Sequence, residues 1–337
     1  MIKEAIQKLV DGKSLSMEEA AQVMEEIMSG EVTPAQFGAF VTALRLKGET
    51  VDEIAGLASV MQAKAARVKV TGPVIDVVGT GGDGSATFNI STAAAFVVAG
   101  AGLKVAKHGN RAMSSRCGSA DVLEALGVKI ELTAGQVQKC LEEVGIGFMF
   151  APAFHPAMKY AGTPRREIGI RTVFNILGPL TNPAGASAYL LGVADGSLVE
   201  KMAQVLQSLD CKHALVVHGE DGLDEITLTG KTQVSELKNG AIKSYSVSPE
   251  DFGLSRASPD SLKGGTAEEN AAILRAVLAG ATGSKRDVVL MNAAAALVAR
   301  DKAASLKEGI ALARETIDSG RALAKLEKLI EFTQHLT

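Results

Sequence analysis

The stretch Val74-Ile75-Asp76-Val77-Val78-Gly79-Thr80-Gly81-Gly82-Asp83-Gly84 joins a short apolar run to a glycine-rich turn. The apolar run predicts a buried strand, and Asn89-Ile90-Ser91-Thr92 further along predicts the start of a helix. A strand, a tight turn and a helix in this order are typical of a parallel sheet covered by helices. This stretch therefore favours an α/β fold.

A second unit of the same kind follows. Leu103-Lys104-Val105-Ala106 predicts a strand, which runs into the turn Lys107-His108-Gly109-Asn110-Arg111. The alternation then continues, and Asn239-Gly240 predicts a polar hairpin over 232–247, ahead of a helical remainder from about 266 to 335. We expect strands at 74–78, 103–106, 128–132, 146–150, 188–193 and 213–218, and helices at 91–100, 119–126, 134–144 and 197–209.

Residues 1 to about 67 instead carry the start and stop signals of short helices. Ser16, Thr33 and Thr50 each begin a capping-box pattern, and Pro34 follows Thr33 at the first helical position. Four such helices predict a small bundle that covers its remaining apolar face with another domain or a second subunit.

Helix-start chemistry recurs inside the α/β region, within 163–180. Thr163 is the expected N-cap and Pro164 the next residue, and we expect this helix to join the bundle and to hinge the two parts. The predicted fold is thus α/β, with a small N-terminal helical bundle, a mainly parallel central sheet and a C-terminal helical cluster. We assign 1–70, plus about 163–182, to the small domain, and 73–162 with 183–337 to the large one.

Composition excludes several classes of protein. The 337 residues carry a formal net charge of −3 and no tryptophan, so neither a basic surface nor an aromatic-rich basic stripe indicates a nucleic-acid partner. Cys117, Cys140 and Cys211 are odd in number and lack metal-ligand spacing. The opening residues predict an amphipathic helix, and the apolar run 93–103 is too short for a bilayer. We expect a cytoplasmic protein with no membrane partner.

The two turns are the expected anion site. Glycine lets backbone N–H groups approach an anion, and no Asp or Glu occurs from Gly84 to Ala120, where Lys104, Lys107, Arg111 and Arg116 do occur. Two such turns at one sheet edge indicate a ligand with more than one phosphate. For the first turn alone, an ordinary glycine turn with Ser/Thr capping remains an alternative.

Two nucleotide-binding motifs fit less well. Gly79-x-Gly81-x-x-Gly84 matches the dinucleotide fingerprint in form, but that motif also requires an acidic residue roughly 20 positions on. After Asp83 the next acid is Asp121, and no Gly-Lys-Ser/Thr of a Walker motif follows.

The acidic pair Asp224-Glu225 follows an expected strand. In a loop, these carboxylates could hold Mg²⁺ together with a diphosphate, whereas a solvated acidic turn is the plain alternative. His108 has no carboxylate nearby in sequence to orient it as a general base, so packing remains open for it.

Taken together, these motifs resemble those of the anthranilate phosphoribosyltransferase family, over nearly the whole chain. The resemblance rests on the first turn, Asn89-Ile90-Ser91-Thr92, the second turn, Gly118-Ser119-Ala120-Asp121 and Gly178-Pro179-Leu180-Thr181-Asn182-Pro183. It implies transfer of the phosphoribosyl group of PRPP to the amine of anthranilate, with release of pyrophosphate, in tryptophan biosynthesis. It also implies a Mg²⁺ requirement and a homodimer formed through the helical domain.

The resemblance also implies roles for individual residues. Lys107, His108, Asn110 and Arg165 are the candidate catalytic residues, and Gly79, Asn110 and Arg165 the anthranilate contacts, with His108 and His155-Pro156 along its approach. Metal contacts are Ser91, Asp224 and Glu225. The PRPP contacts are Gly79, Gly82, Asp83, Thr87, Asn89, Ser91, Thr92, Lys107, Ser115 and Ser119.

Two other functions stay open at this point. A pyrimidine nucleoside phosphorylase would share the implied fold but would not need the Asp224-Glu225 pair. A non-catalytic relative would bind nucleic acid or a phosphorylated effector, although the intact Lys107, Asn110 and Arg165 and the acidic net charge speak against it.

Overall fold

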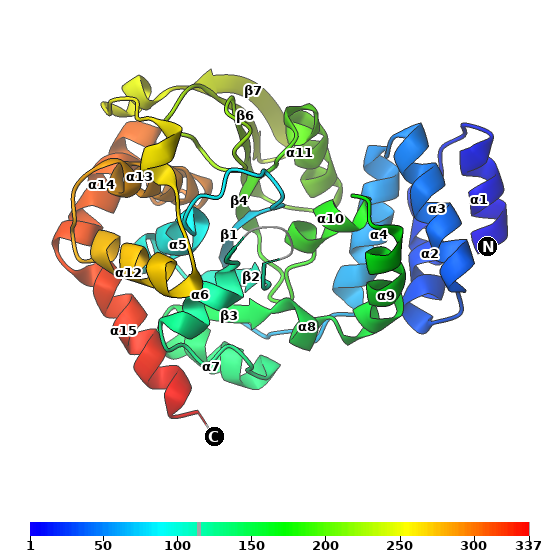
Figure 1. The fold of residues 1–337 in the computed structure, drawn as a ribbon, viewed down its shortest axis with the longest axis horizontal. Helices are drawn as coiled ribbons and strands as arrows, with labels where there is room; N and C mark the ends of the chain where they lie inside the picture. The colour runs from blue at the N-terminus through cyan, green and yellow to red at the C-terminus, as the bar shows by residue number, and fades with distance from the viewer. Residues whose placement is uncertain (113–115, 337) are drawn as a thin grey trace.

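The computed structural model describes residues 1–112 and 116–336. At the N-terminus lie α1 (Ile2–Val10), α2 (Met17–Ser29), α3 (Pro34–Lys47) and α4 (Val51–Ala63), at one end of the molecule (Figure 1). The predicted capping boxes at Ser16, Thr33 and Thr50 are all present, and each cap accepts the backbone N–H three residues on. The start of each of these helices is therefore determined locally by its sequence.

The rest of the chain surrounds a sheet of seven strands in the order β3-β2-β1-β4-β5-β6-β7. Neighbours from β3 to β5 are parallel, and β6 and β7 are antiparallel. The mainly parallel sheet and the hairpin at Asn239-Gly240 are thus confirmed. The strands are β1 (Ile75–Gly79), β2 (Val105–Gly109), β3 (Ile146–Phe150), β4 (Ala188–Gly192), β5 (His213–Gly219), β6 (Thr232–Lys238) and β7 (Ala241–Val247).

Helices cover both faces of this sheet. The chain leaves β1 through α5 (Ile90–Gly100) toward β2, and leaves β4 through α11 (Val199–Ser208) in the opposite direction toward β5. Right-handed crossovers then place α5 and α11 on opposite faces, and the order reverses between β1 and β4. Ligands of such sheets bind outside the carboxyl ends of the strands at this reversal.

The remaining helices complete these layers. The helix α13 (Ser284–Ala299) packs against α5, β4 and β5, so its alanine run lies in the core, and α11 contacts α4 of the bundle. The other helices are α6 (Ser119–Ala125), α7 (Ala134–Glu143), α8 (Ala151–Phe154), α9 (Lys159–Ile168), α10 (Phe174–Leu177), α12 (Ala267–Leu278), α14 (Leu306–Asp318) and α15 (Arg321–Gln334). Short 3-10 turns are η1 (Pro156–Met158), η2 (Gly178–Leu180), η3 (Gly196–Leu198), η4 (Pro249–Phe252) and η5 (Pro259–Leu262).

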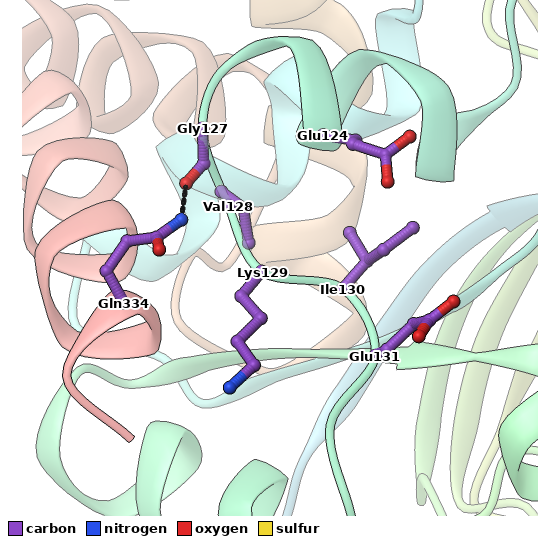
Figure 2. Close-up of a pocket in the computed structure, with 7 residues that line it drawn as sticks. All are labelled: Glu124, Gly127, Val128, Lys129, Ile130, Glu131 and Gln334. Carbon is purple, nitrogen blue, oxygen red and sulfur yellow. Dashed lines mark hydrogen bonds between the residues drawn. The ribbon is translucent and has the colours of Figure 1, made fainter. Parts of the chain in front are cut away.

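The strand expected at 128–132 is wrong. Val128, Ile130 and Leu132 are buried in alternation, but the segment pairs with no strand. Its backbone instead bonds to one helix, because Lys129 N donates to Thr333 Oγ1 of α15. The Gln334 amide of α15 donates to the carbonyl of Gly127, just before the segment (Figure 2). Alternating apolar residues indicate which side chains are buried. They do not indicate which groups the backbone hydrogen-bonds to.

The helix start expected at Thr163 is also wrong. The chain turns helical at Pro156 and continues into α9, so Pro164 lies inside the helix. Thr163 Oγ1 accepts a hydrogen bond from Arg166 and caps nothing. As expected, however, this helix packs against α2 and α3.

Candidate active site

The first glycine turn leaves β1 where the strand order reverses. Gly81, Gly82 and Gly84 have φ of 67°, 76° and 71°, so the turn needs residues without a Cβ. Gly79 stands level with Gly192 of β4, and a Cβ on either would collide with Asp224. The glycines therefore make room for an acidic residue from a distant loop.

The acidic pair closes this end of the sheet. Asp224 and Glu225 lie in the loop between β5 and β6, as the metal hypothesis requires. Gly81 N donates to Asp224 Oδ2 at 2.7 Å, and Ser91 N, in the first turn of α5, donates to Glu225 Oε1 at 3.0 Å. Both carboxylates thus contact backbone N–H groups of the predicted anion site.

Burial changes the protonation of these carboxylates. It raises the pKa of Asp224 to about 6, with a further contribution from the negative charge of Asp83. It also raises the pKa of Glu225 well above its ordinary value, and the Asp224 charge adds to this shift. Neither carboxylate forms an ion pair with a described Lys, Arg or His. Two buried carboxylates without such a partner favour the binding of a cation.

These residues fit Mg²⁺ as part of a mixed site. No group of three or more His, Cys, Asp or Glu among the described residues is arranged to hold a metal by itself. Two carboxylates and the Ser91 hydroxyl are nevertheless hard oxygen donors. Mg²⁺ commonly takes one or two carboxylates and completes its shell with water and substrate phosphates.

Lys107 supplies the buried positive charge. It lies in β2, one strand from the first turn, and is 3% exposed. Its Nζ donates to the Val77 carbonyl at 2.6 Å and to Ser91 Oγ at 3.3 Å. Burial lowers the pKa of Lys107, while Asp76, Glu225 and Asp224 favour its charged form.

A buried network that sequence reasoning missed holds β2 in place. Asp76 accepts a hydrogen bond from His108 N at 3.3 Å and from Asn182 Nδ2 at 2.7 Å, and Asn182 also donates to the Ala106 carbonyl. Burial raises the pKa of Asp76 to about 6, against the opposing effect of Lys107. The sequence does contain a signal for this network. Asp76 lies within an apolar run that predicts a buried strand, and a buried charge needs a partner.

Polar side chains hold the rest of the first turn in shape. Asp83 accepts from Ser85 N and Oγ, and Ser85 Oγ lies 3.4 Å from Thr87 Oγ1. Asn89 Nδ2 donates to the Cys117 carbonyl just before α6, and Asn270 Nδ2 donates to Asn89 Oδ1. Asn270 is a further residue that the sequence did not single out.

Thr92 differs from the other polar residues of the first turn. Its Oγ1 is buried and has no hydrogen-bond partner among the residues that the structure describes, unlike the side chains that hold the turn.

The second turn is less basic than its sequence predicts. Arg111 pairs with Asp121 at 3.0 Å and with Glu124 at 2.8 Å, so this cation is neutralised by α6. Asn110 is exposed, and its carbonyl accepts the Ser119 hydroxyl at 3.3 Å. The expected PRPP contact Ser115 lies outside the described residues.

Of the expected anthranilate contacts, Arg165 comes from α9 and not from the glycine turns. Arg165, on α9, is half-buried, stacks on Phe174 with 5.4 Å from guanidinium carbon to ring centroid, and has no acidic partner among the described residues. No described hydrogen bond or ion pair joins Arg165 to the glycine turns. Burial lowers its pKa.

Two of the expected residues of the acceptor's approach, His108 and His155, lie near each other. The rings of His108 and His155 are 5.0 Å apart. Burial lowers the pKa of His108 to about 3 and that of His155 to about 4, so both are neutral at pH 7.

Comparison with known proteins identifies the class to which this fold and site belong. A glycosyl transferase family helical bundle domain matches residues 3–65, and the a/b domain of the glycosyl transferase family matches residues 71–323. The chain thus has both parts of a two-domain glycosyl transferase.

Individual relatives narrow the class. An anthranilate phosphoribosyltransferase from Dehalococcoides mccartyi is 62% identical over 338 residues, covering 100% of this chain and 99% of the relative. The Thermus thermophilus structure of that name has a TM-score of 0.93 at 48% identity, covering 98% of this chain and 99% of its own. The Saccharomyces cerevisiae enzyme of that name in complex with PRPP and Mg has a TM-score of 0.91 at 31% identity, covering 99% of this chain and 98% of its own. Its structure in complex with 4-fluoroanthranilate has a TM-score of 0.89 at 30% identity, with the same coverage of both chains. This chain belongs to the anthranilate phosphoribosyltransferase family, as its motifs indicated.

Proposed function

We propose that this protein transfers the phosphoribosyl group of PRPP to the amine of anthranilate and releases pyrophosphate, a step of tryptophan biosynthesis. One observation carries the proposal beyond family membership. Asp224 and Glu225 lie against the N–H groups of Gly81 and Ser91 at the strand reversal, with the buried Lys107 ammonium bonded to Ser91. Two carboxylates and one lysine beside these backbone N–H groups suit a magnesium diphosphate.

The residues of this site match the charge changes in the reaction. The bond from ribose C1 to the pyrophosphate oxygen breaks, the bond from C1 to the anthranilate nitrogen forms, and the amine loses a proton. Mg²⁺ held by Ser91, Asp224 and Glu225 would supply positive charge for the leaving pyrophosphate. Lys107 adds a cation in β2 that two hydrogen bonds hold in place, so it can stabilise negative charge without reorganising.

The chain offers no strong base, and the reaction needs none before attack. An aromatic amine is neutral at pH 7, and His108 is neutral as well because of its burial. We infer that His108 and His155 shape the acceptor's approach, while Arg165 pairs with the anthranilate carboxylate. Gly79 and Asn110 complete the proposed acceptor contacts. Because α9 packs against α2 and α3, movement of the helical part would carry Arg165 toward PRPP.

We also propose a homodimer formed through the helical domain. A surface cavity of about 660 Å³ lies between α1 and α3, and its lining includes Leu9, Val10, Ala43 and Leu46. Val10 is 67% and Leu46 82% exposed, which is unusual for large apolar side chains that lie close together.

The expected cellular setting rests on separate observations. Within the described residues, no helix is both long enough and apolar enough to cross a bilayer. Cys140 and Cys211 are free thiols and both are buried, which fits the reducing cytoplasm that we propose as the location.

One assay tests the function. The protein is mixed with PRPP, Mg²⁺ and anthranilate, and anthranilate fluorescence is followed; we expect a loss of signal that requires all three. Asp224→Asn should abolish most of it, whereas Asp52→Asn, an exposed aspartate of α4, serves as the matched control. Absence of metal-dependent consumption would sink the proposal, and phosphate-dependent cleavage of a pyrimidine nucleoside would favour the phosphorylase alternative.

A further inference from the structure

An arginine outside every expected contact set lies on the first glycine turn. Arg171 Nη2 donates to the Gly81 carbonyl at 3.1 Å, across 90 residues of sequence. Its guanidinium also lies over Gly82, where a Cβ would collide with Nη1. Gly81 is therefore held from two sides, through its N–H by Asp224 and through its carbonyl by Arg171.

The backbone before and after Arg171 fixes its position. Gly169 ends α9 with φ of 69°, and Thr172 N donates to Asn175 Oδ1 at the start of the next helical turn. Thr172 and Val173 are buried. The exposed Arg171 side chain thus extends from an anchored connection between α9 and α10.

Within the described part of the chain, no acidic group neutralises the charge of Arg171. It forms no ion pair with any described acid, whereas Arg111 is neutralised by Asp121 and Glu124. A guanidinium has five N–H donors, and the Gly81 carbonyl takes one of them. A planar cation with free donors beside exposed turn glycines suits bidentate binding of a phosphate group.

We propose that Arg171 is a further substrate-binding residue, whose guanidinium binds the diphosphate of PRPP at the first glycine turn. This inference rests on the proposed function for the identity of the ligand. It gives the connection after α9 a role in substrate binding, in addition to the role proposed for Arg165 on α9 itself. Through Arg171, the part of the chain that packs on the bundle would contact the leaving group.

The test compares Arg171→Ala, Arg171→Lys and Arg166→Ala. Arg166 is the matched control, an exposed arginine of α9 that bonds only to Thr163 among the described residues. We expect Arg171→Ala to raise the PRPP KM about tenfold or more and the anthranilate KM less than twofold. Arg171→Lys should recover only part of the loss, because an ammonium lacks the planar fork. Arg166→Ala should match the wild type.

Calorimetric binding of magnesium pyrophosphate, without anthranilate, gives a readout separate from turnover. We expect about tenfold weaker binding for Arg171→Ala at an unchanged Tm. An unchanged pyrophosphate affinity would overturn the proposal, and so would an equal rise in both KM values, which indicates a merely structural role for Arg171. If the wild type binds pyrophosphate through Arg171 but consumes no anthranilate, the proposed function fails and the Arg171 assignment stands.

Discussion

Lys107 shows how one residue type sets the chemistry of this site. Burial lowers the pKa of the Lys107 ammonium, whereas three carboxylates, Asp76, Glu225 and Asp224, favour its charged form. Its two acceptors, the Val77 carbonyl and Ser91 Oγ, leave one N–H for a ligand.

Lys107→Met tests this charge. The thioether keeps the length of the side chain but removes the cation that we place at the leaving pyrophosphate. We expect kcat to fall by about 10²–10³, the usual effect of losing one preorganised electrostatic group. Steady-state kinetics of the purified variant, with circular dichroism to check folding, give the measurement. A folded Lys107→Met protein with kcat within threefold of the wild type would exclude this role.

Asp76 gives a prediction about pH. Its pKa of about 6 in the folded protein lies above the ordinary value of 3.8, so between these pH values the folded state retains a proton that the unfolded state has lost. Stability therefore falls as pH rises through this window, and the shift of roughly two units corresponds to about 3 kcal/mol. Asp76→Asn removes this pH dependence of stability. The hydrogen bonds lost in the variant lower its stability by an amount that does not change with pH.

Urea unfolding of the wild type and Asp76→Asn at pH 4, 5, 6 and 7 measures that difference. The stability advantage of the wild type should be largest at pH 4 and should shrink by about 3 kcal/mol by pH 7. Asp52→Asn on α4 corrects for the loss of one surface charge. A difference that stays constant across the series would show that Asp76 keeps its ordinary pKa, with Lys107 outweighing burial.

Among the elements, local chemistry explains what the sequence could predict. Thr33-Pro34 and the other N-caps specify helix starts through contacts three residues apart, so these starts were predictable. The segment 128–132 was not, because its burial pattern fits a strand while its backbone bonds to α15 across more than 200 residues. The helix start predicted at Thr163-Pro164 was wrong for a similar reason, since the chain had already turned helical at Pro156.

Gly56 tests how the helices of the bundle pack. It lies where α4 crosses α2, and a Cβ there would collide with the Met17 carbonyl oxygen of the backbone. Gly56→Ala must push the helices apart, and we expect a loss of roughly 1–3 kcal/mol. Gly162→Ala in α9 is the matched control, because open space surrounds that position and alanine favours a helix by about 0.5–1 kcal/mol. Thermal unfolding should lower Tm for the first variant and not for the second; equal values would contradict the close crossing.

At the scale of the whole molecule, the site depends on contacts that no local pattern reveals. Asp224 reaches Gly81 across 143 residues, Glu225 reaches Ser91 across 134 and Asn182 reaches Asp76 across 106. Glycine turns and an acidic pair could be found in the sequence as separate motifs. Which carboxylate faces which N–H follows only from the order of the strands, and this is why Asp76, Arg171 and Asn270 were missed.

The apolar cavity between α1 and α3 leads to a prediction about assembly. Leu46 is 82% exposed at its edge, and burying such a side chain against a second copy gains about 1.5–3 kcal/mol. Leu46→Glu replaces that gain with the cost of burying a carboxylate, so it should dissociate the proposed homodimer. Light scattering after size exclusion should give twice 34.9 kDa for the wild type and 34.9 kDa for Leu46→Glu. Ile170→Glu changes another exposed apolar residue, on the connection after α9, and should keep the dimer mass. A monomeric wild type, or a dimeric Leu46→Glu protein, would rule out this face as the interface, because a contact centred on the cavity cannot accommodate a buried charge without a partner.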